Sequence, residues 1–131
     1  MDITWKYASP VSERQINNVE KIWGFTVPNC LKEIIKIGNN GFPSKNKFDA
    51  KDTKEHVIKT LLSYNENDIE NVFTAFAALK ESDIDKIFPF ANDPAGNLIC
   101  MNGSEVVLWN HETGTTEKVA DSVNDFFEHL Y

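Results

Sequence analysis

The sequence lacks an apolar run of the roughly 18 to 20 residues that a membrane span needs. Its first residues, MDITWKYASP, also lack the basic start and apolar stretch of a secretory signal peptide. Cysteine occurs only at Cys30 and Cys100, which is too few and too isolated for a disulfide framework or a cysteine-ligated zinc site. These absences predict a soluble, cytoplasmic protein with two buried thiols.

Motifs that preorganise chemistry are missing as well. The chain has no G-x-S-x-G elbow, no Gly-rich phosphate loop and no closely spaced pair of metal ligands. An enzyme would have to recruit its base and orienter from Asp93, His111 and Glu112, and its nucleophile would be Ser104 or Cys100. His111 and Glu112 are neighbours, and neighbours on a strand point to opposite faces. We therefore predict that the protein is not an enzyme and holds no metal or cofactor.

Positive charge is scarce in the second half of the chain. Residues 1–63 carry ten Lys or Arg and seven Asp or Glu, a balance of +3, whereas residues 64–131 carry three and thirteen, a balance of -10. Such a field repels nucleic acid and anionic lipid, and it speeds encounter with a basic protein. The charge favours a protein partner over nucleic acid or a membrane, although solubility alone would also account for it.

The composition is that of an ordinary globular protein, with 41% hydrophobic and 25% charged residues. A chain of 131 residues is long enough to bury about two thirds of the surface that its unfolded form exposes, but it leaves no room for a second core. We expect one domain over residues 1–131.

Two helices are predicted near the N-terminus. The first opens at Ser12, where SERQ matches a capping box, and ends at Gly24. Its expected apolar face is Ile16, Val19, Ile22 and Trp23. The second begins at Pro28 and ends in the turn at residues 38–41. Its expected apolar stripe is Leu31, Ile34 and Ile35.

The middle of the chain predicts a polar loop at residues 44–55 with a short strand around Phe48, followed by one strand within residues 56–65. A capping box at Asn67 to Glu70 then predicts a third helix. Its apolar side would be Ile69, Val72, Phe73 and Phe76. The sequence SDID at residues 82–85 predicts a further short cap before an extended segment at residues 87–91.

The C-terminal part predicts a β-meander and a closing helix. The turn at residues 93–97 and the Asn-Gly pair of NGSE, which favours a type I′ hairpin, separate short apolar runs. A strand around residues 118–120 leads into the capping box SVND and a helix with apolar Phe126, Phe127 and Leu130. The predicted class is α+β: a mainly antiparallel sheet packed by N-terminal helices, a middle helix and a C-terminal helix.

Four stretches in this order resemble the SUKH superfamily, which includes fungal regulators of cell-wall synthesis and many bacterial immunity proteins. They are VPNCLKEIIKIGNNG, IFPFANDPAGNLICM, VVLWNHETG and SVNDFFEHLY. The likeness spans residues 12–131. It departs from the family pattern at residues 38–41, where Asn-Gly-Gly is usual, and at Val123, where the family has Phe.

The resemblance implies a non-catalytic immunity protein that binds and neutralises a cognate polymorphic toxin, often a nuclease. A regulatory or scaffolding module with another protein partner is the alternative. A small hydrolase that uses His111 is the third and weakest hypothesis. We predict that the partner contacts acidic and aromatic groups near the sheet and its loops: Asp49, Asp52, Tyr64, Glu66, Asp93, Trp109, His111 and Glu112.

Overall fold

The computed structural model describes residues 2–82 and 86–131. Its helices are α1 (Glu13–Trp23), α2 (Asn29–Gly38), α3 (Val72–Glu81) and α4 (Val123–Glu128). Its short strands are β1 (Trp5–Lys6), β2 (Phe42–Pro43), β3 (Lys47–Phe48), β4 (His56–Val57) and β5 (Thr60–Leu61). The longer strands are β6 (Ile87–Asn92), β7 (Leu98–Asn102), β8 (Glu105–Trp109) and β9 (Thr116–Ala120). Among these residues no helix is long and apolar enough to cross a membrane.

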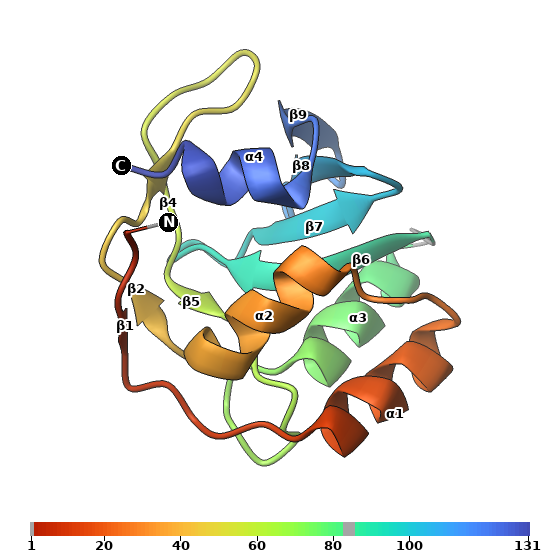
Figure 1. The fold of residues 1–131 in the computed structure, drawn as a ribbon. Helices are drawn as coiled ribbons and strands as arrows, with labels where there is room; N and C mark the ends of the chain where they lie inside the picture. Colours follow the sequence, from red (N-terminus) through yellow and green to blue (C-terminus); the bar gives the residue numbers. More distant parts are fainter. Residues whose placement is uncertain (1, 83–85) are drawn as a thin grey trace.

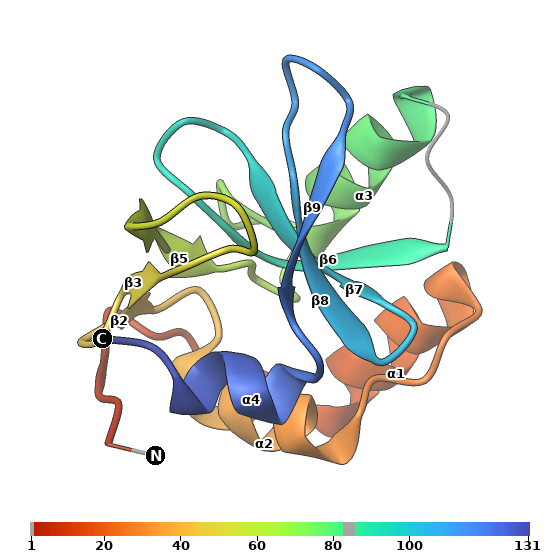
Figure 2. The ribbon, with the colours of Figure 1, turned by 90° about the horizontal axis from the view of Figure 1, so that it is seen from above.

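The strands β5 to β9 form one antiparallel sheet in the order β5-β6-β7-β8-β9, and β1-β2 and β3-β4 form two small antiparallel pairs. The helices α2 and α4 lie side by side on one face of this sheet, and α3 lies on the other (Figures 1 and 2). The predicted α+β class with a mainly antiparallel sheet is therefore confirmed.

The strands β6 and β7 are apolar almost without gaps because helices cover both faces of the sheet. In β7, Leu98 and Cys100 alternate with Ile99 and Met101, yet all four are buried. A strand with one wet face would alternate apolar and polar residues instead. Each of β6, β7 and β8 pairs antiparallel with the strand that follows it in the chain, so the predicted meander is confirmed.

The hairpin between β7 and β8 differs from the predicted turn type. Asn102 pairs with Glu105, so the two-residue loop is Gly103-Ser104 and Asn102 still belongs to the strand. Positive φ occurs at Gly103 (61°) but at neither Asn102 nor Ser104. This is the pattern of a type II′ turn, which needs Gly at its first central position, rather than type I′.

The helix α1 begins as predicted. The Ser12 hydroxyl accepts a hydrogen bond from the backbone N–H of Gln15, the Gln15 side chain accepts one from the N–H of Ser12, and Gly24 ends the helix at φ 67°. Ile22, however, is 53% exposed and does not belong to the buried face.

In α2 the stripe of Leu31, Ile34 and Ile35 is buried as predicted. Gly38 ends this helix beneath the Trp5 indole, where an added Cβ would lie 2.6 Å from a ring atom. The turn that follows does more than reverse the chain. Asn39 is buried, accepts a hydrogen bond from the N–H of Tyr64 and donates one to the hydroxyl of Ser63. It thus joins α2 to the loop before α3.

The helix α3 starts later than predicted. Its N-cap is Asn71, whose side-chain oxygen accepts a hydrogen bond from the N–H of Thr74, so the proposed capping box at residues 67–70 is wrong. Residues 64–70 form turns and bends, and Ile69 is 94% exposed. Ser82 is the C-cap of α3, and the remainder of the predicted SDID cap, residues 83–85, lies outside the described residues.

The single strand predicted within residues 56–65 is also wrong, because this segment divides between two partners. β4 pairs with β3, whereas β5 pairs with the end of β6. The Asn92 side chain helps to hold β5 by accepting hydrogen bonds from the N–H and the hydroxyl of Thr60, both at 3.1 Å.

Candidate protein-binding site

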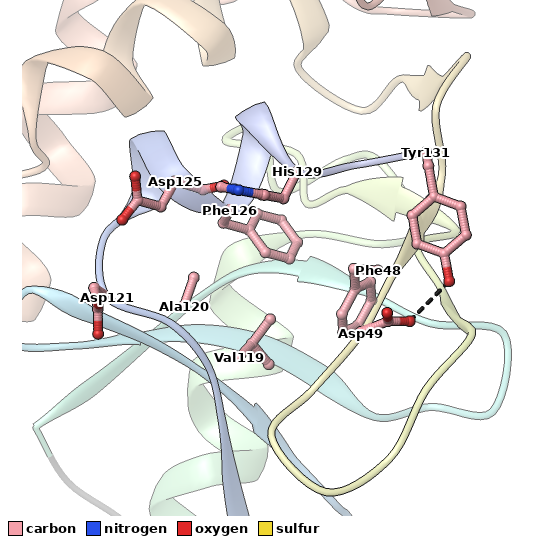
Figure 3. Close-up of a pocket in the computed structure, with 9 residues that line it drawn as sticks. All are labelled: Phe48, Asp49, Val119, Ala120, Asp121, Asp125, Phe126, His129 and Tyr131. Carbon is pink, nitrogen blue, oxygen red and sulfur yellow. Dashed lines mark hydrogen bonds between the residues drawn. The ribbon is translucent and has the colours of Figure 1, made fainter.

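Two segments that are distant in sequence, residues 48–49 at the end of β3 and residues 119–131 from β9 through α4 to the end of the chain, line a hollow of about 380 Å³. We call it the acidic hollow. Its nine lining residues are Phe48, Asp49, Val119, Ala120, Asp121, Asp125, Phe126, His129 and Tyr131. Figure 3 shows Asp49 and Tyr131 at one end, Asp121 and Asp125 at the other, and apolar side chains between them.

The floor of the acidic hollow is part of the core. Phe126 and Phe48 are each 2% exposed and pack edge to face with ring centroids 5.3 Å apart. Phe126 also contacts Phe90 and Phe127. Since buried rings in several mutual contacts have little freedom to move, the floor holds a fixed shape.

Hydrogen bonds close the end of the hollow that Asp49 and Tyr131 form. Lys47 and Tyr131 exchange two backbone hydrogen bonds of 2.9 and 3.0 Å. The Tyr131 hydroxyl also donates to the Asp49 carboxylate at 2.7 Å (Figure 3). Together these contacts fasten the end of the chain to the segment around β3.

The loop after β3 is tied to the edge strand β9. The Glu117 carboxylate accepts hydrogen bonds from the backbone N–H groups of Asp52 (2.7 Å) and Thr53 (3.0 Å) and from the Thr53 hydroxyl (3.0 Å). The N–H of Lys51 donates to the carbonyl of Lys118 at 2.9 Å. These bonds cover a sheet edge that would otherwise be open to pairing with another chain, and they hold the rim of the hollow in place.

Hydrogen bonds lower the pKa of two of the carboxylates. The N–H of Glu55 and the hydroxyl of Tyr131 lower the pKa of Asp49 below its ordinary value, because both donate to the charged form. A hydrogen bond from Lys118, together with its charge, lowers the pKa of Asp121. These shifts extend to lower pH the range over which both ends of the hollow are anionic.

His129 and His111 are both engaged with backbone carbonyls. Nδ1 of His129 lies 2.8 Å from the carbonyl oxygen of Asp125, and Nε2 of His111 lies 2.8 Å from that of Ala95. A carbonyl only accepts, so each of these ring nitrogens carries a hydrogen. This places His111 as a link between the turn after β8 and the turn after β6.

A second hollow of about 340 Å³ lies against α3, and we call it the Trp109 hollow. Among the residues that line it, Leu62, Ile69, Ala75, Ala78, Leu98 and Trp109 are apolar. The polar residues Glu70, Asn71, Thr74, Asn92 and His111, together with Gly96, complete it. Trp109 itself is 3% exposed, and its buried indole N–H has no hydrogen-bond partner among the described residues.

The structure distributes the predicted contact residues over several places. Asp49 lines the acidic hollow, and Asp52 is exposed in the loop beside it. His111 lines the Trp109 hollow and is exposed. Glu66 and Glu112 are exposed in turns. The eight residues therefore do not form one site.

Three of the predicted contact residues are not on the surface. Tyr64 is 2% exposed and packs edge to face on Trp23, and Trp109, the last residue of β8, is 3% exposed. Asp93 is 8% exposed, and its carboxylate accepts hydrogen bonds from the N–H groups of Ala95 and Asn97 and from the Asn97 side chain. The turn interpretation of Asp93 is thus confirmed, and the expectation that these three residues face a partner is corrected.

His111 and Glu112 also differ from their predicted setting. They lie in the turn that follows β8, not on the strand, so the strand argument against their sharing a site does not apply. Cys100 is fully buried, and burial raises the pKa of its thiol. A thiol held protonated in the core is not a nucleophile.

Sequence reasoning missed most of the acidic hollow. Asp121 and Asp125 lie on either side of the N-cap Ser122, and the sequence pattern there predicted only a helix start and no binding site. Tyr131 reaches Asp49 across 82 positions of sequence. The two acids beside the helix cap were the one local signal for this hollow. The contact between residues 48–49 and the end of the chain forms only in the folded protein and has no sequence motif.

Over residues 10–129 the chain matches the SMI1 / KNR4 family (SUKH-1), and because this match spans most of its length, the chain belongs to that family. The resemblance to the SUKH superfamily is thereby confirmed. The family is known for immunity proteins, which are typically non-catalytic and act on a protein partner. No curated protein matches the chain.

Proposed function

We propose that this protein is an immunity protein: a non-catalytic, cytoplasmic domain that binds a cognate toxin and neutralises it by covering the toxin's active site or a surface beside it. A basic nuclease domain is the expected partner. The whole chain, residues 1–131, acts as one domain in this proposal.

The observation that supports the proposal most directly is the acidic hollow on a chain of this family. A nuclease must present cations to hold phosphates, so its working surface is complementary to anionic groups. The excess of acidic residues in the second half of the sequence also attracts a basic partner at long range. Complementary charge raises the association rate, and desolvated contacts at the interface lengthen the lifetime of the complex.

The test is co-expression with the toxin domain encoded beside this protein. We expect survival of cells that make both proteins, and recovery of a complex when an inactivated toxin is used as bait. Death of the cells together with no complex at low salt would contradict the proposal. If no toxin gene lies beside the gene for this protein, and the protein captures an unrelated regulatory protein, the scaffolding alternative is favoured.

The role of charge can be tested separately from the role of the family. Reversing exposed acids within residues 64–131 is expected to slow association with the toxin and to weaken its salt dependence, because steering scales with the local field. Reversing the same number of exposed acids in residues 1–63 is the matched control. Equal association rates for both sets, measured at two ionic strengths, would remove steering from the account.

A further inference from the structure

We propose that the acidic hollow receives one arginine side chain of the partner protein. The identity of the partner rests on the proposed function, whereas the chemistry of the hollow stands on its own contacts. Arginine combines an apolar stem with a planar cation that carries five N–H donors.

The hollow has a surface for each part of that side chain. Its floor is apolar, with Phe48 and Phe126 buried and Val119 half-buried. An aliphatic stem laid on this floor would leave water without losing a hydrogen bond. The Tyr131 ring at one end is 51% exposed and also attracts a cation, a guanidinium more readily than an ammonium (Figure 3).

The carboxylates at its ends have unused acceptors. Both hydrogen bonds to Asp49, from Glu55 and Tyr131, end on Oδ1, which leaves Oδ2 without a donor among the described residues. Lys118 contacts Asp121 through Oδ1 alone. The Asp125 carboxylate has no hydrogen-bond or ion-pair partner within residues 2–82 and 86–131. Asp125 is therefore the first anchor for a guest cation.

The placement of these acids favours an extended guest over a metal ion. In the described part of the chain, no three His, Cys, Asp or Glu side chains are grouped so that they could hold a metal. Asp49 instead lies across the apolar floor from Asp121 and Asp125 (Figure 3). A lysine would bring a single charge centre to this space, whereas a guanidinium fork can donate to a carboxylate through two nitrogens.

Charges near the rim limit the long-range attraction. The loop after β3, beside the hollow, carries the exposed Lys51 and Lys54. In addition, Lys118 pairs with Asp121 and neutralises part of its charge. Selection of the guest must therefore come from contacts at hydrogen-bond distance. The loss of one such contact is expected to matter more than a change in net charge elsewhere on α4.

The first experiment needs no toxin. Isotope-labelled protein is titrated with N-acetyl-arginine amide, and amide shifts are followed by NMR. We expect saturable shifts at residues 119–131 and at Asp49 in the millimolar range. The neutral isostere N-acetyl-citrulline amide and the variant Asp125→Asn should abolish them, and N-acetyl-lysine amide should bind more weakly. Equal shifts with citrulline, or shifts centred on another surface, would overturn the assignment.

The second experiment measures affinity for the inactivated toxin domain. Asp125→Asn should weaken binding about 10- to 100-fold, the range for losing a charged hydrogen-bond acceptor. Glu128→Gln is the matched control, since Glu128 is exposed on the same helix, is not among the residues that line the hollow, and changes the net charge equally. The variant keeps the helix cap, in which the backbone N–H of residue 125 donates to the Ser122 hydroxyl, and thermal unfolding checks this.

The two proposals fail in different ways. A wild-type protein that does not bind the toxin overturns the proposed function, and the arginine titration still reports on the hollow. A wild-type protein that binds the toxin, with Asp125→Asn and Glu128→Gln equally tight, overturns the arginine site and leaves the immunity function intact.

Discussion

The acidic hollow and the Trp109 hollow have similar sizes, about 380 and 340 Å³, but they are built in different ways. The acidic hollow has core rings as its floor and hydrogen-bonded carboxylates at its ends. The Trp109 hollow lies between α3 and the sheet, six of its twelve lining residues are apolar, Glu70 is its one acid, and Ile69 is almost fully exposed at its rim.

This difference separates shape from charge as sources of binding. A partner of the Trp109 hollow would meet one carboxylate, Glu70, which Lys59 already pairs, so apolar and neutral polar contacts rather than charge would favour it. A partner of the acidic hollow must supply a cation of matching length and direction. Specific recognition is therefore expected at the acidic hollow, where a wrong partner would leave carboxylates desolvated and unpaired.

The largest effect is expected at the floor of the acidic hollow. Phe126→Ala should lower the free energy of unfolding by about 3–5 kcal/mol, because the residue is 2% exposed and contacts three other rings. Chemical denaturation measures this loss. A loss below about 1 kcal/mol would mean that the floor is not part of the core, and the contrast between the two hollows would disappear.

The sequence predicted the meander well because its signals are local and consistent. Apolar runs bounded by turn residues define β6, β7 and β8, and burial on both faces explains why those runs are continuous. The N-caps at Ser12 and Ser122 were likewise correct, since a side chain three residues from its partner needs no tertiary information. Only Ser12 has the reciprocal bond of a capping box, because among the described residues the Asp125 side chain does not accept from the N–H of Ser122.

The errors occurred where tertiary pairing decides local structure. Residues 56–61 have one continuous strand pattern, but β4 and β5 pair with different strands, so the segment divides. Asn67 resembled a helix cap, yet Asn71 is the residue that caps α3. The acidic hollow could not be predicted for the same reason, because its ends meet only after the chain has folded.

The next largest effect concerns the loop that forms the rim of the acidic hollow. Glu117→Ala should cost about 1 kcal/mol, since three loop donors lose their acceptor but can turn to water. Hydrogen exchange at the amides of Asp52 and Thr53 should accelerate markedly. Glu112→Ala, an exposed acid in another turn, is the control and should leave both amides unchanged. Unchanged protection in Glu117→Ala would show that the loop is held by other contacts.

A smaller, pH-dependent effect is expected at Asp49. Its folded pKa lies below its unfolded value, because Glu55 and Tyr131 donate to the charged carboxylate. Such a group stabilises the fold above the unfolded pKa of about 3.9, and this stability is lost as the pH falls through the folded pKa. Asp49→Asn should therefore be less stable than the wild type at pH 7, with a difference that shrinks below about pH 4. Unfolding midpoints between pH 2.5 and 7 measure it.

The control for this titration is Asp52→Asn, in the same exposed loop, where the backbone N–H rather than the carboxylate contacts Glu117. It should parallel the wild type across the same range. If Asp49→Asn and Asp52→Asn follow the same pH profile, the Tyr131 bond does not hold the end of the hollow in solution.

The smallest effect is expected at the rim of the Trp109 hollow. Ile69 is 94% exposed, so Ile69→Ser removes almost no buried surface and should change the free energy of unfolding by less than about 0.5 kcal/mol. Its effect on toxin affinity should also stay within about twofold, because an isolated apolar side chain on a surface is common and does not by itself indicate an interface. A large loss of affinity in Ile69→Ser, with Asp125→Asn unaffected, would invert the comparison. The partner would then bind through apolar contacts at the Trp109 hollow, and the carboxylates of the acidic hollow would contribute only to solubility.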